Sequence, residues 1–354
     1  MLAALAALYP ENPFQTAAYA AACRGRDGET WLLGEFDGTA LLSGCVATFV
    51  RARWGRMLAI PSVAPPVAPE GFWAGVVELC RRENIDRLHV ESFGSRASQL
   101  PMLSARTSRR VRREFVVDLQ AVPLFPRLTG HHKRNIQRAR RAGIRVSEAR
   151  DEGACARHAL LVEHSLSRRR ERGETITGTS LACVVDGCVE PRACAVTAAL
   201  YARSGQERAR APRSPGCCVG ACLESGIASV YEAKLGQEVV ASMVVVESVE
   251  GAYCASAGTN AEGRRWGAAH LLNHEIAHAL QAAGKRTLNL GGGSPSEAGL
   301  LRFKSGFGAS ATALEAAIYD FRGPLRRWVT EWIRSLHQAT LRRRPARRDD
   351  PETR

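Results

Sequence analysis

The segment between residues 229 and 290 restricts the fold most, because strand-type and helix-type runs follow one another there in a regular order. Two β-rich runs separated by Gly236-Gln237 form a hairpin pattern. A third strand, a glycine-containing loop, a helix stopped by Gly284 and a short strand follow. Strands combined with a helix in this order predict a mixed α/β sheet covered by helices. The predicted runs are 229–235, 239–246, 251–258, the loop 259–263, the helix 266–283 and the strand 287–290.

The first 125 residues also have mixed α/β order. Asp37-Gly38 separates two strand-type runs, which is a hairpin signal. An amphipathic helix over 72–82 and strands over 88–92 and 114–119 follow. A basic helix over 128–142 then ends at Gly143, as expected for a glycine C-cap. A chain of 354 residues usually divides into two domains, so we predict an N-terminal domain (1–125), a C-terminal domain (126–325) and a basic helical tail (326–354).

Residues 178–224 interrupt the C-terminal domain with a segment of little periodicity. The spacing of its cysteines is not that of a paired Cys-x-x-Cys zinc site. Three interpretations stay open, namely a metal-binding insertion, a flexible insertion and a locally mistranslated stretch, and we favour the flexible insertion. The six cysteines in this segment, of eleven in the chain, are Cys183, Cys188, Cys194, Cys217, Cys218 and Cys222.

The chain carries a formal net charge of +14, mostly from arginine. A basic protein suits phosphorylated or polyanionic partners such as coenzyme A, nucleotide-linked sugars or tRNA. The apolar start, residues 1–8, has no basic flank and reaches Tyr9-Pro10 too soon for a secretory signal. No later run is long enough to span a bilayer. We therefore expect a cytoplasmic protein with reduced cysteines and no stable membrane insertion.

The segment Arg264-Arg265-Trp266-Gly267-Ala268-Ala269 lies between a predicted strand and a predicted helix. It fits the R-x-x-G-x-A form of the pyrophosphate loop of GNAT acyltransferases. Small residues let backbone N–H groups approach a phosphate, and the start of a helix adds a positive dipole end. This pattern predicts that Arg264, Gly267, Ala268 and Ala269 bind the phosphates of an acyl donor, with an ordinary loop entering a helix as the alternative.

Three further motifs resemble the Fem-type members of the GNAT superfamily, which include aminoacyl-tRNA-dependent peptidoglycan bridge enzymes and stand-alone acetyltransferases. Residues 132–146 resemble the family's basic helix and the strand after it. Gly291-Gly292 resembles its Asp-x-Gly-Gly turn, and residues 299–308, with Phe303-Lys304 at their centre, resemble its Gly-Leu-x-x-Phe-Lys-x-x-Phe-Gly signature. The likeness covers most of residues 126–322 outside the insertion.

This resemblance implies two tandem GNAT-like domains with mixed central sheets, a substrate cleft between them, and N-acyl transfer to an amine on a small or cell-envelope precursor. It implies that Lys304 contacts a substrate phosphate or the negative charge that develops during transfer. It also implies substrate binding by Arg134, Asn135, Gly291, Gly292 and Phe303. No metal is expected.

The chain departs from the Fem-type pattern in two places. Asn289 replaces the acidic residue before the glycine pair, and no long helical arm is recognisable. The missing arm favours acetyl-CoA or another acyl-CoA as the donor. Aminoacyl-tRNA, used to extend a peptidoglycan or other peptidyl acceptor, is the alternative donor.

A different enzyme class is indicated by His274-Glu275-Ile276-Ala277-His278, which satisfies H-E-x-x-H. Two histidines one helical turn apart can bind zinc while the glutamate acts as a base. Such a metallopeptidase needs a third ligand, for which Glu297 is the candidate. In the acyltransferase interpretation this helix packs on the sheet, and both histidines face solvent or the cleft.

Overall fold

The computed structural model describes residues 1–23, 28–52, 55–63, 69–95, 99–121, 123–151, 153–173, 223, 225–293, 297–325 and 328. The interpretations of the cysteine-rich segment 178–224 and of the tail 326–354 therefore concern residues that lie almost entirely outside the described ranges. Both remain predictions.

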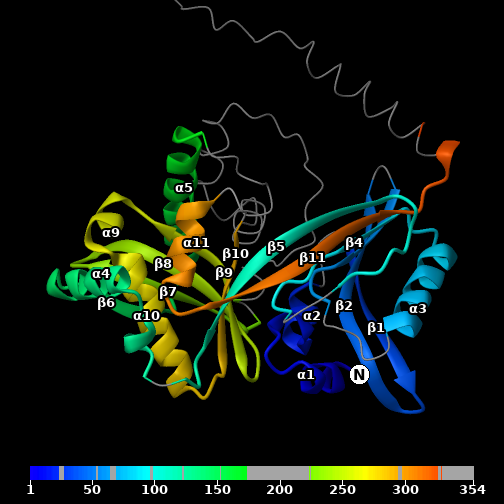
Figure 1. Cartoon of the computed structure of the whole chain (residues 1–354), viewed down its shortest axis with the longest axis horizontal. Helices are drawn as coiled ribbons and strands as arrows, with labels where there is room; N and C mark the ends of the chain where they lie inside the picture. The colour runs from blue at the N-terminus through cyan, green and yellow to red at the C-terminus, as the bar shows by residue number, and fades with distance from the viewer. Residues whose placement is uncertain are drawn as a thin grey trace, which may run out of the picture.

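The N-terminal half builds one edge of the sheet (Figure 1). Strands β1 and β2 form a hairpin, β2 pairs with β3 in antiparallel fashion, and a helix then returns the chain to β4, which is parallel to β3. Two short helices and a 3-10 turn precede these strands. The elements are α1 (Leu2–Leu8), η1 (Pro13–Gln15), α2 (Ala17–Ala22), β1 (Gly28–Asp37), β2 (Ala40–Ala52), β3 (Gly55–Ile60), α3 (Pro69–Arg82) and β4 (Arg87–Val90).

The C-terminal half repeats this order. Strands β7, β8 and β9 form an antiparallel meander, helices follow, and β10 returns parallel to β9. Its elements are α4 (Gly130–Arg141), β6 (Arg145–Ala149), α5 (Ala154–Glu171), β7 (Ala228–Leu235), β8 (Glu238–Glu247), β9 (Gly251–Thr259), α9 (Ala261–Trp266), α10 (Ala268–Ala282), β10 (Thr287–Gly293) and α11 (Ala298–Ser305). The repeated order makes the architecture that of two tandem α/β units.

Two long strands are exchanged between the halves. Strand β5 (Thr107–Asp118) leaves the N-terminal half to pair with β10, whereas β11 (Ser310–Asp320) leaves the C-terminal half to pair with β4. Because β5 and β11 also pair with each other, all the described strands form one sheet in the order β1-β2-β3-β4-β11-β5-β10-β9-β8-β7-β6. The two exchanged strands cross the centre of the molecule in Figure 1. The proposed domain division near residue 126, at η2 (Phe125–Arg127), stays a prediction.

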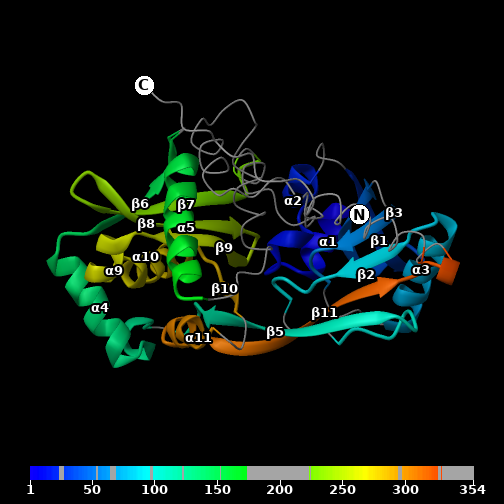
Figure 2. The ribbon, with the colours of Figure 1, turned by 90° about the horizontal axis from the view of Figure 1, so that it is seen from above.

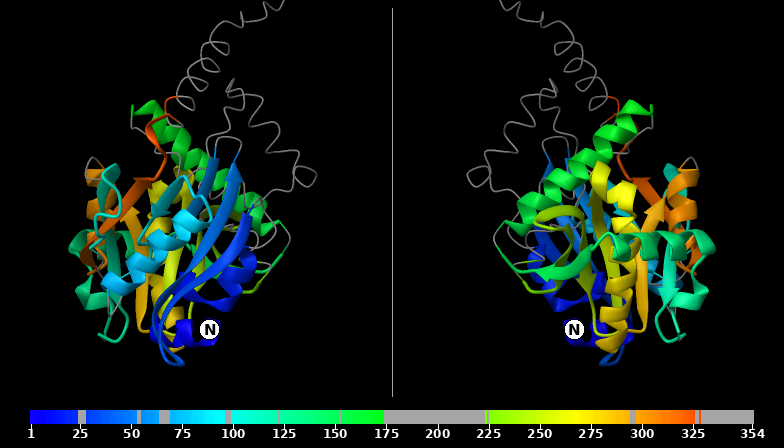
Figure 3. Two further views of the ribbon diagram at one scale, coloured as in Figure 1. Left: turned by 90° about the vertical axis from the view of Figure 1, so that its right-hand side faces the viewer. Right: turned by 90° about the vertical axis from the view of Figure 1, so that its left-hand side faces the viewer.

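Helices cover both faces of the sheet, as Figures 2 and 3 show from above and from the two ends. Helices α4 and α10 bury Ile136, Leu271 and Ile276 against Met243 and Val245 of β8. On the opposite face, His158 of α5 reaches Ser242, the neighbour of Met243 in β8, and α1 and α2 pack against Val244. Alternate residues of β8 therefore face different helical layers, as the two-residue period of a strand requires.

The contact between α5 and β9 leaves no room for a side chain at Gly258. A Cβ there would lie 2.4 Å from both the Leu161 carbonyl carbon and the Val162 amide nitrogen. We expect Gly258→Ala to lower the free energy of unfolding by about 3 kcal/mol, because the helix must move away from the strand. Gly75→Ala is the control: a Cβ there meets nothing within 4 Å, and alanine inside a helix should add about 1 kcal/mol. Urea unfolding of both variants measures the difference, and equal free energies would contradict the packing argument.

The structure confirms the predicted hairpins and corrects two segments. The region predicted as a loop, 259–263, contains the start of helix α9, which Asn260 caps by accepting from the Gly263 N–H at 2.8 Å. The helix predicted over 266–283 is divided at Gly267, whose φ of 79° ends α9 and begins α10. Asparagine is a strong helix N-cap and glycine adopts positive φ at low cost, so both corrections follow from residues already in the sequence.

Candidate active site

The pairing between the parallel strands β9 and β10 ends in the middle of the C-terminal half. Pairs run from Thr287 with Gly251 to Asn289 with Tyr253, and none is formed beyond them. On its other side, β10 has a bulge against β5 between Asn289 and Gly292. Gly291, in this bulge, has a φ of 73°, which glycine adopts without steric cost. We call this place the β9–β10 fork and define it by Tyr253, Cys254 and residues 289–292.

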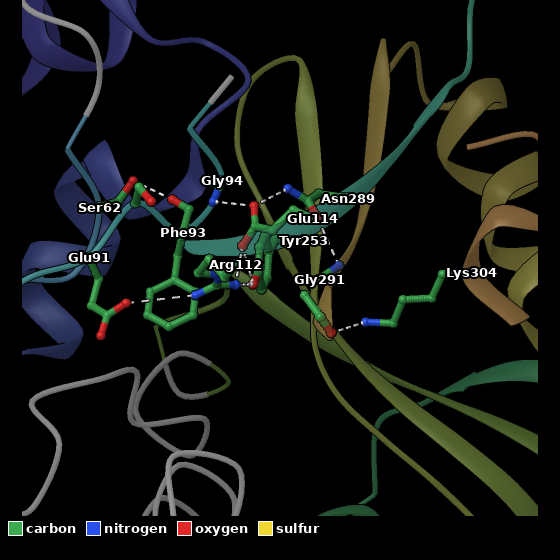
Figure 4. Close-up of polar contacts among 12 residues, drawn as sticks. Ser62, Glu91, Phe93, Gly94, Arg112, Glu114, Tyr253, Asn289, Gly291 and Lys304 are labelled. Carbon is green, nitrogen blue, oxygen red and sulfur yellow. Dashed lines mark hydrogen bonds and ion pairs between the residues drawn. The ribbon is translucent and has the colours of Figure 1, made fainter. Parts of the chain in front are cut away.

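Lys304 reaches the fork from helix α11. Its side chain is 9% exposed, and its Nζ donates a hydrogen bond of 2.6 Å to the Gly292 carbonyl oxygen (Figure 4). Burial lowers the pKa of Lys304 to about 8, although the neighbouring Cys254 and Glu114 act in the opposite direction. The Lys304 side chain is therefore not a solvated surface group. A buried ammonium group that is still mostly charged at neutral pH can bind negative charge strongly, because little water screens it.

A buried carboxylate lies beside the fork. Glu114 of β5 has no exposed surface, and its oxygens accept hydrogen bonds from elements of both halves (Figure 4). Tyr253 Oη and Asn289 Nδ2 donate at 2.9 and 2.8 Å, and the backbone N–H of Gly94 donates at 3.0 Å. The Arg112 guanidinium forms an ion pair with the same carboxylate. Burial and the negative charge of Glu114 raise the pKa of Tyr253 well above its ordinary value, so the phenol stays a donor.

Arg112 links this carboxylate to the N-terminal half. Its guanidinium carbon lies 3.9 Å from the centre of the Phe93 ring, a cation–π contact. Its Nη1 lies 3.9 Å from Oε2 of Glu91. Phe14 packs against both Phe93 and Tyr253 at centroid distances of 6.1 and 5.0 Å. Residues from both halves therefore pack around the Glu114 carboxylate and Tyr253 at the fork.

Other predicted site residues gather where α4, α10 and α11 meet. Phe303 lies with its ring centre 5.7 Å from His132 and 5.0 Å from His270. Asn135 is buried in α4 and donates to the His131 carbonyl oxygen at 2.9 Å, whereas Arg134 is exposed on the outside of the helix. The structure thus brings Gly291, Gly292 and Lys304 together at the fork. Asn135 and Phe303 lie at the junction of the three helices, whereas Arg134 lies apart from them on the exposed face of α4. Their substrate-binding roles stay predictions.

The residues predicted to bind donor phosphates lie at the break between α9 and α10. Gly267 is enclosed, since a Cβ there would lie 2.8 Å from the Asn135 carbonyl oxygen, and Ala268 is fully buried. Arg264 and Ala269 are partly exposed, and Arg264 donates to the Thr259 carbonyl oxygen at 3.3 Å. This helical break is covered on one side by α4, so only part of it is open to a ligand.

The candidate third ligand Glu297 does not join the two histidines of the H-E-x-x-H segment. His274 is 3% exposed and packs on Phe125, which corrects the expectation that both histidines face solvent or the cleft. Glu275 forms an ion pair with Arg140, and Glu297 forms one with Arg169. Within the described ranges, no group of three or more His, Cys, Asp or Glu side chains is placed to hold a metal.

The sequence motifs did not identify Glu114, Arg112 or Tyr253. One signal was present, because Glu114 begins the apolar run 114–119 and a carboxylate in such a strand requires buried partners. Its partners come from positions 94, 253 and 289, which only the folded chain brings together.

Comparisons with known proteins agree with this architecture. Residues 161–305 match the family model described as an acetyltransferase (GNAT) domain. The crystal structure of FemX superposes with a TM-score of 0.62 over 93% of this chain and 98% of FemX, at 10% identity. L-PGS from Bacillus licheniformis gives a TM-score of 0.50 over 94% of this chain and 96% of its own, at 13% identity. No curated protein sequence matches the chain.

These comparisons confirm the predicted fold class and the resemblance to Fem-type GNAT proteins. A match that spans nearly the full length of both chains fits the tandem order of the two halves. Among the residues the structure describes, no helix is both long and apolar enough to cross a membrane.

Proposed function

We propose that this Fem-like acyltransferase of the GNAT fold transfers an acyl group from an activated donor to an amine, with the reaction centred on the β9–β10 fork. The single observation that carries the proposal is the buried ammonium group of Lys304, 2.6 Å from the Gly292 carbonyl oxygen. Acyl transfer passes through a tetrahedral intermediate with an oxyanion, and a fixed cation in a dry site stabilises that charge more than water does.

In the proposed reaction the protein positions the two substrates and stabilises the oxyanion. The neutral amine of the acceptor attacks the donor carbonyl carbon, a C–N bond forms, and the carbonyl oxygen becomes an oxyanion beside Lys304. The intermediate then collapses, the bond to the leaving group breaks, and the proton lost by the amine nitrogen is taken up by the leaving sulfur or oxygen. Lys304 keeps its proton throughout and acts as an electrostatic catalyst. The Gly291-Gly292 turn would bound the space for the acceptor at the fork, and Phe303 would contact the acceptor from the neighbouring junction of α4, α10 and α11.

The first proposed donor is an acyl-CoA, and its diphosphate would bind at Arg264, Gly267, Ala268 and Ala269. The match of residues 161–305 to an acetyltransferase domain supports this donor. The start of α10 supplies N–H groups and a positive dipole end for the phosphates. The proposed acceptor is an amine on a small molecule or on a cell-envelope precursor.

Aminoacyl-tRNA is the second candidate donor, and two observations favour it. Gly267 and Ala268 are enclosed by α4, which narrows the room for a diphosphate. The outer face of α4 and the start of β6 expose an arginine-rich surface suited to a nucleic-acid backbone. Its members are Arg134, Arg138, Arg140, Arg141 and Arg145.

Titration calorimetry with acetyl-CoA and with charged tRNA separates the two donors. We expect saturable binding of acetyl-CoA, weakened about tenfold by Arg264→Ala, since one contact to a phosphate is removed. Arg265→Ala is the matched control, because Arg265 is exposed and pairs only locally with Glu262. Binding of charged tRNA without binding of acetyl-CoA would replace the first donor with the second. Binding of neither would remove the acyltransferase proposal.

A further inference from the structure

A buried carboxylate lies against the glycine turn of the fork. Asn289, two residues before Gly291, donates from its Nδ2 to Glu114 Oε2 at 2.8 Å. Glu114 comes from β5 and is paired through its backbone with Gly292, directly beside the bulge.

We propose that Glu114 is the positioning residue that holds both strands of the fork around Lys304. The inference rests on the proposed acyl transfer for its kinetic consequences. Its structural part can be tested without any turnover.

A chain of contacts leads from Glu114 to Lys304. Asn289 gives its N–H to Glu114 and its Oδ1 accepts the backbone N–H of Gly291 at 2.8 Å. That bond fixes the positive-φ turn, and the next carbonyl, of Gly292, holds the Lys304 ammonium group at 2.6 Å. A loose turn would therefore let the ammonium group move away from the reacting carbonyl.

Glu114 also holds the second strand of the fork. Tyr253 of β9 donates to Glu114 Oε1 at 2.9 Å, while Asn289 of β10 donates to Oε2. One carboxylate thus bridges the two strands at the point where their own pairing ends. The Gly94 N–H and Arg112 add contacts from the N-terminal half. The fork is consequently fixed to both halves through a single side chain.

The site requires a carboxylate and not an amide. Four donors converge on Glu114, and an ionised carboxylate offers about four lone-pair sites without any hydrogen of its own. A glutamine would accept on one atom only and would point two N–H groups at existing donors. The charge of Glu114 also raises the pKa of Lys304 against the effect of burial, which keeps the ammonium form present at neutral pH.

Glu114→Gln tests the proposal with two readouts. We expect kcat to fall about 100-fold with little change in KM, the loss typical of a reacting group displaced by about 1 Å. We also expect the pKa of Lys304, followed by NMR of its side chain, to fall below that of the wild-type protein. The NMR readout needs no substrate, so it separates failure of this inference from failure of the proposed reaction.

Glu232→Gln is the matched control. Glu232 is also fully buried and is paired with Arg157 at 2.7 Å and Lys234 at 3.3 Å, but it lies on β7 away from the fork. The Glu232→Gln substitution should lower the free energy of unfolding and leave both kcat and the pKa of Lys304 unchanged. Equal effects of the two substitutions on kcat, or an unchanged Lys304 pKa in Glu114→Gln, would overturn the positioning role.

Exchanging the two side chains gives a stricter test. Asn289→Asp alone places a second carboxylate against Glu114 and should be as inactive as Glu114→Gln. The double variant Glu114→Gln with Asn289→Asp restores one donor and one acceptor between these positions, so we expect it to recover part of the lost kcat. Additive losses would contradict the proposal. If Glu114→Gln does not fold, Tyr253→Phe removes a single donor and should still lower kcat with little loss of stability, and unchanged kcat would again count against it.

Discussion

Lys304→Met is expected to lower the rate of acyl transfer about 10²–10³-fold while leaving the melting temperature unchanged or higher. Removal of one preorganised group that stabilises an oxyanion has this kinetic cost. The expected effect on stability has the opposite sign. Burial lowers the pKa of Lys304 from 10.5 to about 8, so the folded state disfavours the charged form by about 3 kcal/mol. Methionine has a similar length and carries no charge into the same space.

Lys285 provides a matched control for this substitution. Its side chain is 15% exposed, it donates to the Ser248 carbonyl oxygen as Lys304 donates to that of Gly292, and it pairs with Glu247 at 3.3 Å. Lys285→Met should therefore lower the melting temperature, because a partly buried carboxylate loses its partner, and should leave the rate unchanged. Steady-state kinetics and thermal unfolding of both variants provide the comparison. Parallel loss of rate and stability in Lys304→Met would make Lys304 a structural residue.

The rate should also fall as pH rises through the pKa of Lys304. Because the pKa of Lys304 is about 8, half of its ammonium groups have lost their proton near pH 8, a lower pH than for an ordinary lysine. Lys304→Arg should move this loss to higher pH, since guanidinium stays charged. A pH–kcat profile with saturating donor measures the shift. Identical alkaline limbs for the wild type and Lys304→Arg would show that another group controls them.

Local patterns in the sequence predicted much of the C-terminal half. The hairpin of β7 and β8 follows from β-rich runs around Gly236-Gln237, and α10 ends before Gly284 as predicted. Lys304 was indicated by the resemblance of residues 299–308 to the Fem-type signature, and its burial at the fork became apparent only in the folded chain. Hydrophobic period and turn residues act over a few positions, so a sequence reveals them directly.

The exchange of β5 and β11 could not be predicted in the same way. Which strand lies beside β10 depends on pairing over long sequence separations, and β5 has the same apolar alternation in either position. Glu114 shows the consequence for the site. Its partners Gly94, Tyr253 and Asn289 are up to 175 residues away from it in sequence, so their convergence is a property of the exchanged sheet. The contact that Asn289 makes, a hydrogen bond from its side chain to Glu114, is likewise visible only in the folded chain.

The second large effect expected is loss of stability in mild acid. Burial lowers the pKa of several histidines in the described part of the chain, including those of His158 and His274 to about 4 and that of His270 to about 3. In the unfolded chain each binds a proton near pH 6.5, while the folded state does not. The unfolded state therefore binds more protons below pH 6.5, and stability falls as pH decreases until the folded-state pKa values are reached. Each histidine costs about 2 kcal/mol by pH 5.

The three losses together amount to about 6 kcal/mol at pH 5, comparable to the whole stability of an ordinary domain. Nearby charges increase the effect. Arg138 and the other histidines lower the pKa of His270. Arg140 lowers the pKa of His274, which Glu275 raises.

Urea unfolding between pH 7.5 and pH 5 should show a steep decline in the free energy of unfolding. His274→Leu should reduce the slope of the free energy of unfolding against pH by the equivalent of one proton, because leucine is apolar like its neighbour Phe125 and does not titrate. His278→Gln, at an exposed position of the same helix, should leave the slope as it is. A free energy of unfolding that is constant from pH 7 to pH 5 would show that the folded and unfolded states bind equal numbers of protons over this range, and the prediction would then be wrong.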